Sequence, residues 1–502
     1  MKYLHKLGSA QAAHPVKWVA LAAMGLTLSA CSTHGDIQGR LSALESGKLG
    51  LQQATLAEVD AAPQAWWTGY GDRQLASLIE RALADNPSIQ VAQTRWQRVQ
   101  AQAVAVQGEH EAKLQASGEI DRQHFTAHGL YPYPVAGASL TSGTAQLAGS
   151  WELDLFGRQR AEIDSSIGQT KAASADLHAA RLLLSTQVAR TYVQLGRLQS
   201  QRAVAQRTLS QREEMLALVK QRVQAGLDTK VELKQADGAL PETRVQLEAL
   251  DEQIALTRHA LAVLTGQAPN ALDGLTVTLD ALPVQQAPDN VPADLLARRA
   301  DVMAARWRVE SSGFEVDAAR ALFYPNVNLT SYAGYNAIGL ENLFKPASWQ
   351  WGLMPAVHLP LFDGQQRRAN LMGKVAEQDA AIATYNQAVL QAAQDVTDLL
   401  ASGQSLTRQQ REQQAARASI ETAYDLAMQR YRAGMGTYLI VLNAESSVLN
   451  QRRLAIDLQA RVLDSQFALY RALGGSLQTT AASPAPVSSS SPQTIQTRGD
   501  RT

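Results

Sequence analysis

The sequence of 502 residues lacks several features that would reveal a function directly. It contains one cysteine, so it cannot form an intrachain disulfide, and aromatic side chains make up only 6% of it. Its 46 basic and 46 acidic residues balance, which gives no indication of a nucleic-acid partner. GxSxG, Walker and HExxH motifs are absent, and we therefore predict that the protein is not an enzyme and needs no cofactor or metal.

The apolar stretch near the N-terminus is too short to span a membrane. VALAAMGLTL, at residues 19–28, has about 10 residues, half of what a membrane-spanning helix needs. Lysines precede it and small residues follow, as in a secretory signal peptide, which we place at residues 1–30. The next stretch, LSAC, ends at Cys31 and resembles the lipobox of bacterial lipoproteins. This resemblance implies cleavage before Cys31 and a lipid anchor, including palmitate, on that residue. Because Ser32 follows, it also implies sorting to the outer membrane.

The rest of the sequence contains a duplicated unit. QRVQAGLDT at 221–229 is echoed by QRYRAGMGT at 429–437, and WELDLFGRQRAEI at 151–163 by VHLPLFDGQQRRANL at 357–371. The first pair is 208 residues apart, and Phe156 lies 206 residues before its counterpart in the second pair. Matches in the same order at nearly equal offsets indicate a unit of about 200 residues that occurs twice.

Each unit is expected to contain a long helical hairpin. In the first unit, apolar residues recur at heptad spacing from Leu177 to Leu198, which is typical of a coiled-coil seam. No proline interrupts residues 160–224, and a helix of that length would extend about 100 Å. Pro241 lies inside the return helix and is expected to kink or break it.

The hairpins are expected to turn at short, glycine-containing tips. Gly226 and Gly434 suit the left-handed conformation that ends a helix. Thr229 and Thr437 suit the N-cap of the helix that follows.

Two strands per unit are expected between the helices. Apolar and polar residues alternate in TAQLAGSWELDLF at 144–156 and in WQWGLMPAVHLPLF at 349–362, and more weakly in 114–121 and 326–335. Alternation over about ten residues is typical of a transmembrane barrel, although a strand of a soluble sandwich has the same pattern. Four strands leave two open edges, so several chains must share one closed barrel. We expect a homotrimer with twelve strands.

With these patterns, the chain resembles the TolC-like outer-membrane efflux channels, and among them the OprM-like lipoprotein branch of NodT type. The matching segments preserve both repeats and their order: AWWTGYGDRQLASLIERALADNPSIQVA (65–92), SWELDLFGRQRAEID (150–164), LLARRADVMAARW (295–307), ARALFYPNVNLTSYAG (319–334), LPLFDGQQRRANL (359–371) and QRYRAGMGTYLIVLNAESSVL (429–449). The resemblance implies a mainly α-helical fold with a β-barrel part, in which a trimer forms a twelve-stranded outer-membrane barrel on a twelve-helix periplasmic tunnel.

The sequence patterns and the resemblance together divide the chain. Its parts are the signal peptide (1–30), the lipid-anchored segment and equatorial belt (31–73), the first repeat (74–267), the equatorial connector (268–294), the second repeat (295–475) and a Ser/Thr/Pro-rich, disordered tail (476–502).

The function implied by the resemblance is that of an exit channel in a tripartite efflux system. Such a channel passively conducts drugs or other small toxic compounds that an inner-membrane pump delivers through a periplasmic adaptor, or membrane fusion protein. A duct for type I protein secretion shares this architecture and is the main alternative. A structural or adaptor lipoprotein of the periplasm is a further alternative, but it would not need a duplicated unit with Trp-rich amphipathic strands.

Two groups of functional residues are carried over from the family. The hairpin tips at 225–229 and 433–437 would dock the adaptor through Gly226, Leu227, Thr229, Gly434, Met435 and Thr437. Polar contacts at the periplasmic gate would involve Glu232, Arg430 and Tyr431. Thr229 and Glu232 also have the spacing of a capping box, which would explain the acid without a gate.

The predicted constriction departs from the family pattern. Family members commonly place Asp at the two positions occupied here by Ile440 and Asn443. Three asparagines would narrow the pore without three like charges. We therefore expect multivalent cations to block this channel weakly.

Overall fold

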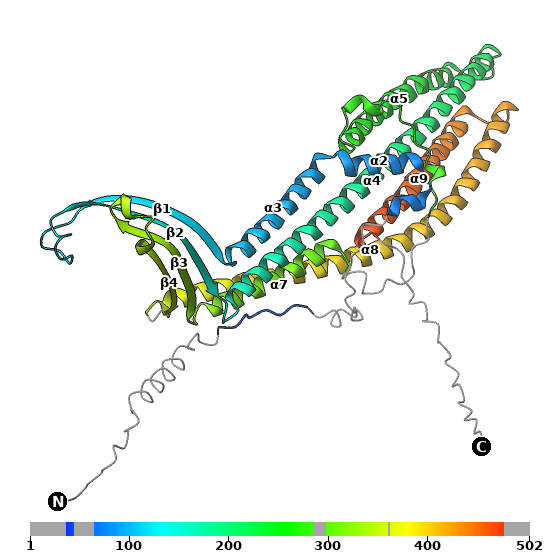
Figure 1. The fold of residues 1–502 in the computed structure, drawn as a ribbon. Coiled ribbons are helices and arrows are strands. Elements are labelled where there is room, and N and C mark those ends of the chain that lie inside the picture. The colour runs from blue at the N-terminus through cyan, green and yellow to red at the C-terminus, as the bar shows by residue number, and fades with distance from the viewer. Residues whose placement is uncertain (1–36, 45–64, 285–297, 360–361, 476–502) are drawn as a thin grey trace, which may run out of the picture.

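The computed structural model describes residues 37–44, 65–284, 298–359 and 362–475. Over these residues the chain is elongated, with a four-stranded sheet at one end and long helices that lead away from it to two hairpin tips (Figure 1). Cys31, the predicted signal peptide and the predicted disordered tail lie outside the described residues.

The helices and strands occur twice in nearly the same order, and they confirm the predicted duplicated, mainly α-helical fold with two strands per repeat. The first repeat consists of α2 (Arg73–Asp85), α3 (Pro87–Glu109), β1 (Lys113–His124), β2 (Ser139–Leu153), α4 (Arg158–Gln224) and α5 (Lys230–Leu264). The second repeat consists of α7 (Ala300–Ala321), β3 (Asn326–Ile338), β4 (Trp349–His358), α8 (Gly364–Arg432) and α9 (Tyr438–Ala472). Short 3-10 helices are η2 (Trp66–Tyr70), η3 (Pro269–Leu272), η4 (Leu279–Ala281), η5 (Leu340–Asn342) and η6 (Pro346–Ser348).

The long helices α4 and α8 have 67 and 69 residues, which corresponds to about 100 Å each. The shorter helices lie end to end in pairs beside the long ones. In space, the start of α3 lies next to the end of α5, and the start of α7 lies next to the end of α9. Gly266 and Gly474 lie at these two junctions with φ of 70° and 73°. A Cβ atom at either glycine would approach a backbone oxygen, that of Asp85 or Arg298, to 2.9 or 3.0 Å. The duplicated unit therefore repeats a close backbone contact as well as its sequence.

A buried aromatic cluster joins the two repeats near the middle of the rods. Trp66 and Tyr70 of η2 pack against Phe467 and Tyr470 of α9, with ring centroids 5.0–6.2 Å apart. The indole Nε1 of Trp66 donates a hydrogen bond of 3.2 Å to Ser185 on α4. The segment before the first repeat thus holds α4 and α9 together.

The sheet is antiparallel in the order β1-β2-β3-β4 and has two chemically different faces. Trp351, Ala333, Leu147 and Ala116 lie in register on one face, where the Trp351 side chain is 71% exposed. The neighbouring register row, on the other face, consists of Gln350, Gly334, Gln146 and Ser117. An exposed apolar face opposite a polar face is the arrangement of a barrel wall in a membrane.

The strand boundaries differ from those expected from the sequence. β1 and β3 continue to His124 and Ile338, because ladder pairing extends toward the loop end of the sheet. β2 and β4 end at Leu153 and His358, earlier than expected, where the chain turns toward α4 and α8.

Of the two effects predicted for Pro241, a kink or a break, the break is wrong. Helix α5 runs through this residue without interruption from Lys230 to Leu264. Leu240 and Leu247 are buried on either side of the proline, and this packing holds both parts of the helix in place.

Among the described residues, none of the helices combines the length and the hydropathy that a transmembrane helix requires.

The residues that follow the predicted lipid anchor lie along α8. Asp379 accepts hydrogen bonds from the backbone N–H groups of Arg40 and Leu41, and Asn386 accepts one of 2.7 Å from Leu44. Ile37 packs against the apolar cluster that α7 and the first turns of α8 form close to the sheet. This segment therefore leads toward the sheet end of the molecule (Figure 1).

Candidate functional site at the hairpin tips

The two hairpin tips have the same backbone geometry. At the first tip, Gly226 has φ of 72° and the N–H of Leu227 donates to the carbonyl of Arg222 at 2.8 Å. At the second tip, Gly434 has φ of 76° and the N–H of Met435 donates to the carbonyl of Arg430 at 2.8 Å. Both are Schellman motifs, in which glycine adopts the left-handed conformation that ends a helix. The predicted role of both glycines as helix stops is confirmed.

Each tip exposes one large apolar side chain. Leu227 is 64% exposed and Met435 is 67% exposed. Both residues directly follow the tip glycine, so they lie at the ends of the hairpins furthest from the sheet (Figure 1). Exposed apolar side chains at equivalent positions of two repeats are suited to contact a partner protein.

The threonines after the tips differ from each other. Thr229 caps α5: its hydroxyl accepts a hydrogen bond of 3.1 Å from Val231, and Glu232 accepts hydrogen bonds from the backbone and hydroxyl of Thr229. This capping box lowers the pKa of Glu232 through the hydrogen bonds from Thr229. Thr437 occupies the N-cap position of α9, but its side chain makes no capping bond. The predicted side-chain cap is therefore wrong there, and Ile440 at the third helical position cannot supply the reciprocal bond of a capping box.

A buried polar link joins the tips of the two hairpins. The hydroxyl of Tyr431, at the end of α8, donates a hydrogen bond of 2.6 Å to Asp228 in the first tip. Arg222 of α4 forms an ion pair of 2.9 Å with the same carboxylate. Arg222 also donates to the backbone carbonyl of Tyr431 at 3.2 Å and lies over its ring, 4.6 Å from the centroid. We call Arg222, Asp228 and Tyr431 the inter-hairpin link.

The link is shielded from solvent and electrostatically balanced. Tyr431 is fully buried, and the side chains of Arg222 and Asp228 are 11% and 9% exposed. Burial alone would raise the pKa of the Asp228 carboxyl, but the hydrogen bonds from Arg222 and Tyr431 together outweigh burial and lower it. Burial, together with the bond to the Asp228 carboxylate, raises the pKa of Tyr431. The link therefore contains an ionised acid and a neutral phenol at neutral pH.

A second ion pair joins the hairpins further from the tips. Arg212 of α4 contacts Glu445 of α9 at 3.1 Å, and their side chains are 14% and 11% exposed. Arg212 also donates to the hydroxyl of Thr243 and the carbonyl of Ala239, both on α5. Buried apolar residues of α4, α5 and α9 form one cluster with Tyr431 of α8: Leu216, Val219, Ala236, Leu240, Tyr438 and Val441.

Of the predicted gate residues, only Tyr431 contacts a side chain of the other hairpin. Glu232 bonds within its own helix cap. Arg430 is exposed and forms no ion pair with the described residues. Ile440, which is 56% exposed, and Asn443 lie three residues apart on an exposed face of α9.

Sequence reasoning missed Arg222, Asp228, Arg212 and Glu445. A signal for Glu445 was present, because it occupies an apolar stripe of α9 with Tyr438, Val441 and Val448. An acid in such a stripe needs a buried partner. Asp228 gave no comparable signal, since its position in the tip is equally suited to a solvated turn residue.

No three His, Cys, Asp or Glu side chains in the described ranges are arranged to hold a metal ion.

Comparisons with known proteins match most of the chain. The model of the family described as outer membrane efflux protein matches residues 78–267 and 291–475. The multidrug resistance outer membrane protein MdtQ of Escherichia coli O6:H1 is 35% identical over 442 residues, which cover 84% of this chain and 92% of that protein.

Solved structures of outer-membrane channels have the same fold. The outer membrane protein VceC of Vibrio cholerae is 32% identical, with a TM-score of 0.77 over 82% of this chain and 99% of that chain. The open state of the MtrE outer membrane channel of Neisseria gonorrhoeae is 27% identical, with a TM-score of 0.74 over 85% of this chain and 98% of that chain.

Proposed function

Because the chain belongs to the outer membrane efflux protein family and is the outer-membrane exit channel of an efflux system, we propose that its inter-hairpin link is the gate of the channel. The observation that carries this proposal is the buried hydrogen bond of 2.6 Å from Tyr431 to Asp228. It ties the tip of one hairpin to the end of the other, at the far end from the sheet (Figure 1).

The energetics of the link suit a gate. A hydrogen bond to a charged group contributes about 1.5–3 kcal/mol, which is enough to favour one hairpin arrangement and small enough for a binding partner to overcome. Separating the hairpins would expose the Asp228 carboxylate to water, which lowers the cost of breaking its bonds. Opening would then move the α8/α9 hairpin away from the α4/α5 hairpin.

We place the gate in a homotrimer. The sheet of one chain has β1 and β4 as open edges, and their unpaired backbone groups would be costly in a membrane. Three copies would close a barrel of twelve strands, with six hairpins below it. The exposed apolar row that contains Trp351 would then face lipid.

The partners would meet the channel at its hairpin tips. A periplasmic adaptor would pack against Leu227 and Met435 and connect the channel to an inner-membrane pump, which supplies the energy for export. The compounds conducted would be drugs or other small toxic molecules, as the name of the relative MdtQ suggests. The tip glycines, Gly226 and Gly434, would let the adaptor approach the backbone closely.

A lipid on Cys31 would anchor the N-terminus beside the barrel. Ile37, only six residues later in the chain, packs near the sheet end of the molecule, and six residues span at most about 20 Å. The acyl chains would therefore reach the inner leaflet of the outer membrane at the base of the barrel.

The gate is tested by single-channel conductance in planar bilayers. Purified wild-type protein is expected to form a mostly shut pore, and Asp228→Asn and Tyr431→Phe are expected to open it more often, because each removes part of the link. Glu232→Gln is the matched control, since Glu232 lies four residues from Asp228 and bonds only within its own helix cap.

The outcomes separate the gate from the channel itself. If Glu232→Gln opens the pore and Asp228→Asn does not, the gate lies at Glu232 and our assignment is wrong. A stable oligomer that inserts into the bilayer but never conducts, in any variant, would contradict the closed barrel and tunnel.

A further inference from the structure

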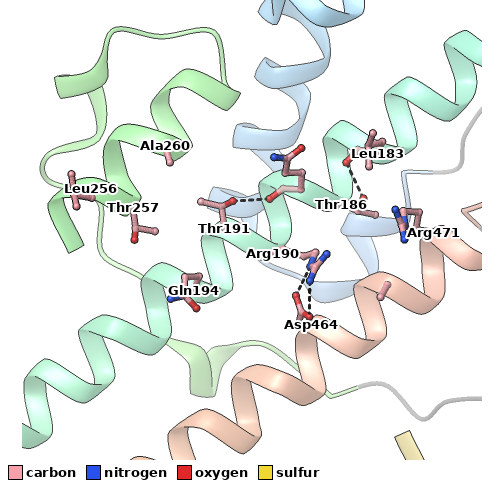
Figure 2. Close-up of a pocket in the computed structure, with 12 residues that line it drawn as sticks. Leu183, Thr186, Arg190, Thr191, Gln194, Leu256, Thr257, Ala260, Asp464 and Arg471 are labelled. Atoms are coloured by element: carbon pink, nitrogen blue, oxygen red, sulfur yellow. Dashed lines mark hydrogen bonds and ion pairs between the residues drawn. The ribbon is translucent and has the colours of Figure 1, made fainter. Parts of the chain in front are cut away.

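A pocket lies between α4, α5 and α9, several helical turns from the tips (Figure 2). Its volume is about 660 Å³, which is within the range of pockets for drug-sized molecules. The lining residues include two arginines and one acid, several hydroxyl and amide side chains, and two leucines. The charged members are Arg190, Asp464 and Arg471.

The pocket opens on the side of α4 that faces away from the equatorial segments. Ser185, Tyr192 and Gln199 of α4 make hydrogen bonds to η2, to the cap of α2 and to the connector before η4. The pocket residues Leu183 and Arg190 each precede one of these contacts by two positions, which places them about 200° around the helix. If the equatorial segments form the outer belt, the pocket faces the interior of the tunnel.

The charges in the pocket favour an anion. Arg190 and Asp464 form a two-point ion pair, with distances of 2.5 and 3.0 Å, and so neutralise each other. Arg471 is exposed and has no ion-pair partner among the described residues, which leaves one positive charge in excess. Figure 2 shows Arg471 on α9, two turns along the helix from Asp464.

The remaining lining residues favour a molecule that is both polar and apolar. Leu183 and Leu256 supply apolar surface from α4 and α5. The hydroxyls of Thr186, Thr191 and Thr257 donate to carbonyls of their own helices, so the donors left for an anion are the amides of Gln187 and Gln194 and the guanidinium of Arg471. A planar apolar body could contact the leucines while an anionic group contacts the guanidinium of Arg471.

We propose that this pocket is a binding site on the tunnel wall for amphiphilic organic anions, of which aromatic carboxylates are the simplest class. This inference rests on the proposed function, because it assigns a solute contact to the inside of the channel. Binding must be weak, since a site within a conducting path has to release its ligand. Arg471 determines the sign of the charge that is bound, and the Arg190–Asp464 pair limits the strength of the attraction.

Two substitutions should change binding in opposite directions. Arg471→Gln removes the excess positive charge and is expected to weaken the binding of 1-naphthoate about threefold to fivefold, as for loss of a partly exposed ion pair. Asp464→Asn frees Arg190 and is expected to strengthen binding by a similar factor. Arg207→Gln is the matched control, because Arg207 is an exposed arginine of α4 that does not line the pocket.

Equilibrium dialysis of 1-naphthoate against the purified oligomer in detergent measures this binding, with protein-free micelles as the blank and 1-naphthylmethylammonium as the cationic comparison. Tighter binding of the anion, with opposite shifts in the two pocket variants, would support the site. Equal binding by wild type and Arg471→Gln, or preference for the cation, would overturn it. Conductance of the same preparation in a bilayer tests the channel separately, so the two proposals can fail independently.

Discussion

The carboxyl group of Asp228 gives the inter-hairpin link a defined pH dependence. Its pKa is lowered in the folded protein, so the link contributes stability above the ordinary Asp pKa of about 4 and loses it as the pH falls through the lowered value. The raised pKa of Tyr431 has the opposite consequence, and its contribution is lost only at strongly alkaline pH. We therefore expect the open probability of the channel to stay constant between pH 5 and pH 8 and to rise below about pH 4.

Single-channel recordings at stepped pH measure this dependence, and Asp228→Asn is the control. The variant lacks the titrating group, so it should already be more open at pH 7 and should change little below pH 4. A wild-type channel that opens between pH 5 and pH 7 would indicate that another group, such as a histidine, controls the gate.

The residues of the inter-hairpin link show which parts of the candidate gate can be predicted from one sequence. Tyr431 was found through the family resemblance, whereas its partner Asp228 is 203 residues away in the chain. No periodicity relates two residues in different hairpins, because their distance depends on how the hairpins pack. Glu232 was carried over from the family as a gate residue, while its spacing from Thr229 indicated a capping box, and its bonds in the structure are those of the capping box.

The first turns of α5 and α9 offer a comparison of two helix starts. Thr229 makes a side-chain cap and Thr437 does not. We expect Thr229→Ala to cost about 1 kcal/mol in local helix stability, and Thr437→Ala to cost much less. Amide hydrogen exchange of the first turn of each helix measures both effects. Equal loss of protection in the two variants would contradict the difference in capping.

The ion pair between Arg212 and Glu445 is expected to support the packing of α4, α5 and α9. Glu445→Ala leaves the Arg212 guanidinium largely buried without its carboxylate partner, and this should cost about 3 kcal/mol or more. The double variant Arg212→Met, Glu445→Leu replaces both charges with apolar groups and should be less destabilised than Glu445→Ala. Thermal unfolding of the purified proteins compares the two. A double variant less stable than Glu445→Ala would contradict this explanation.

Helices and strands were easier to predict than contacts between distant residues, because the sequence patterns that indicate a helix or a strand lie within that segment. Heptad spacing from Leu177 to Leu198 predicted the long helix, and alternation around Trp151 predicted β2. Strand ends were less well predicted, since pairing with the neighbouring strand decides where a strand stops. The break expected at Pro241 does not occur, and buried residues on either side, Leu240 and Leu247, pack both parts of the helix against its neighbours.

Each chain contains the structural unit twice, and in the proposed homotrimer a threefold axis would relate three such chains. Each α9 exposes Ile440 and Asn443 on one face near the tips, and a trimer would bring three copies of each residue around the axis. A constriction of this kind carries no charge. Trivalent cations such as hexamminecobalt should therefore block the wild-type pore weakly. A pore with a ring of carboxylates would attract such cations more strongly.

Asn443→Asp is expected to convert this constriction into a ring of three carboxylates. The added charges should tighten block by hexamminecobalt by about tenfold or more, which corresponds to at least 1.4 kcal/mol shared among three sites. Bilayer conductance with the cation added on the hairpin side measures the block. Asn450→Asp is the matched control, because Asn450 is an exposed asparagine of α9 two turns further from the tip. Tight block of the wild type, or equal effects of the two substitutions, would place the narrowest point of the tunnel away from Asn443.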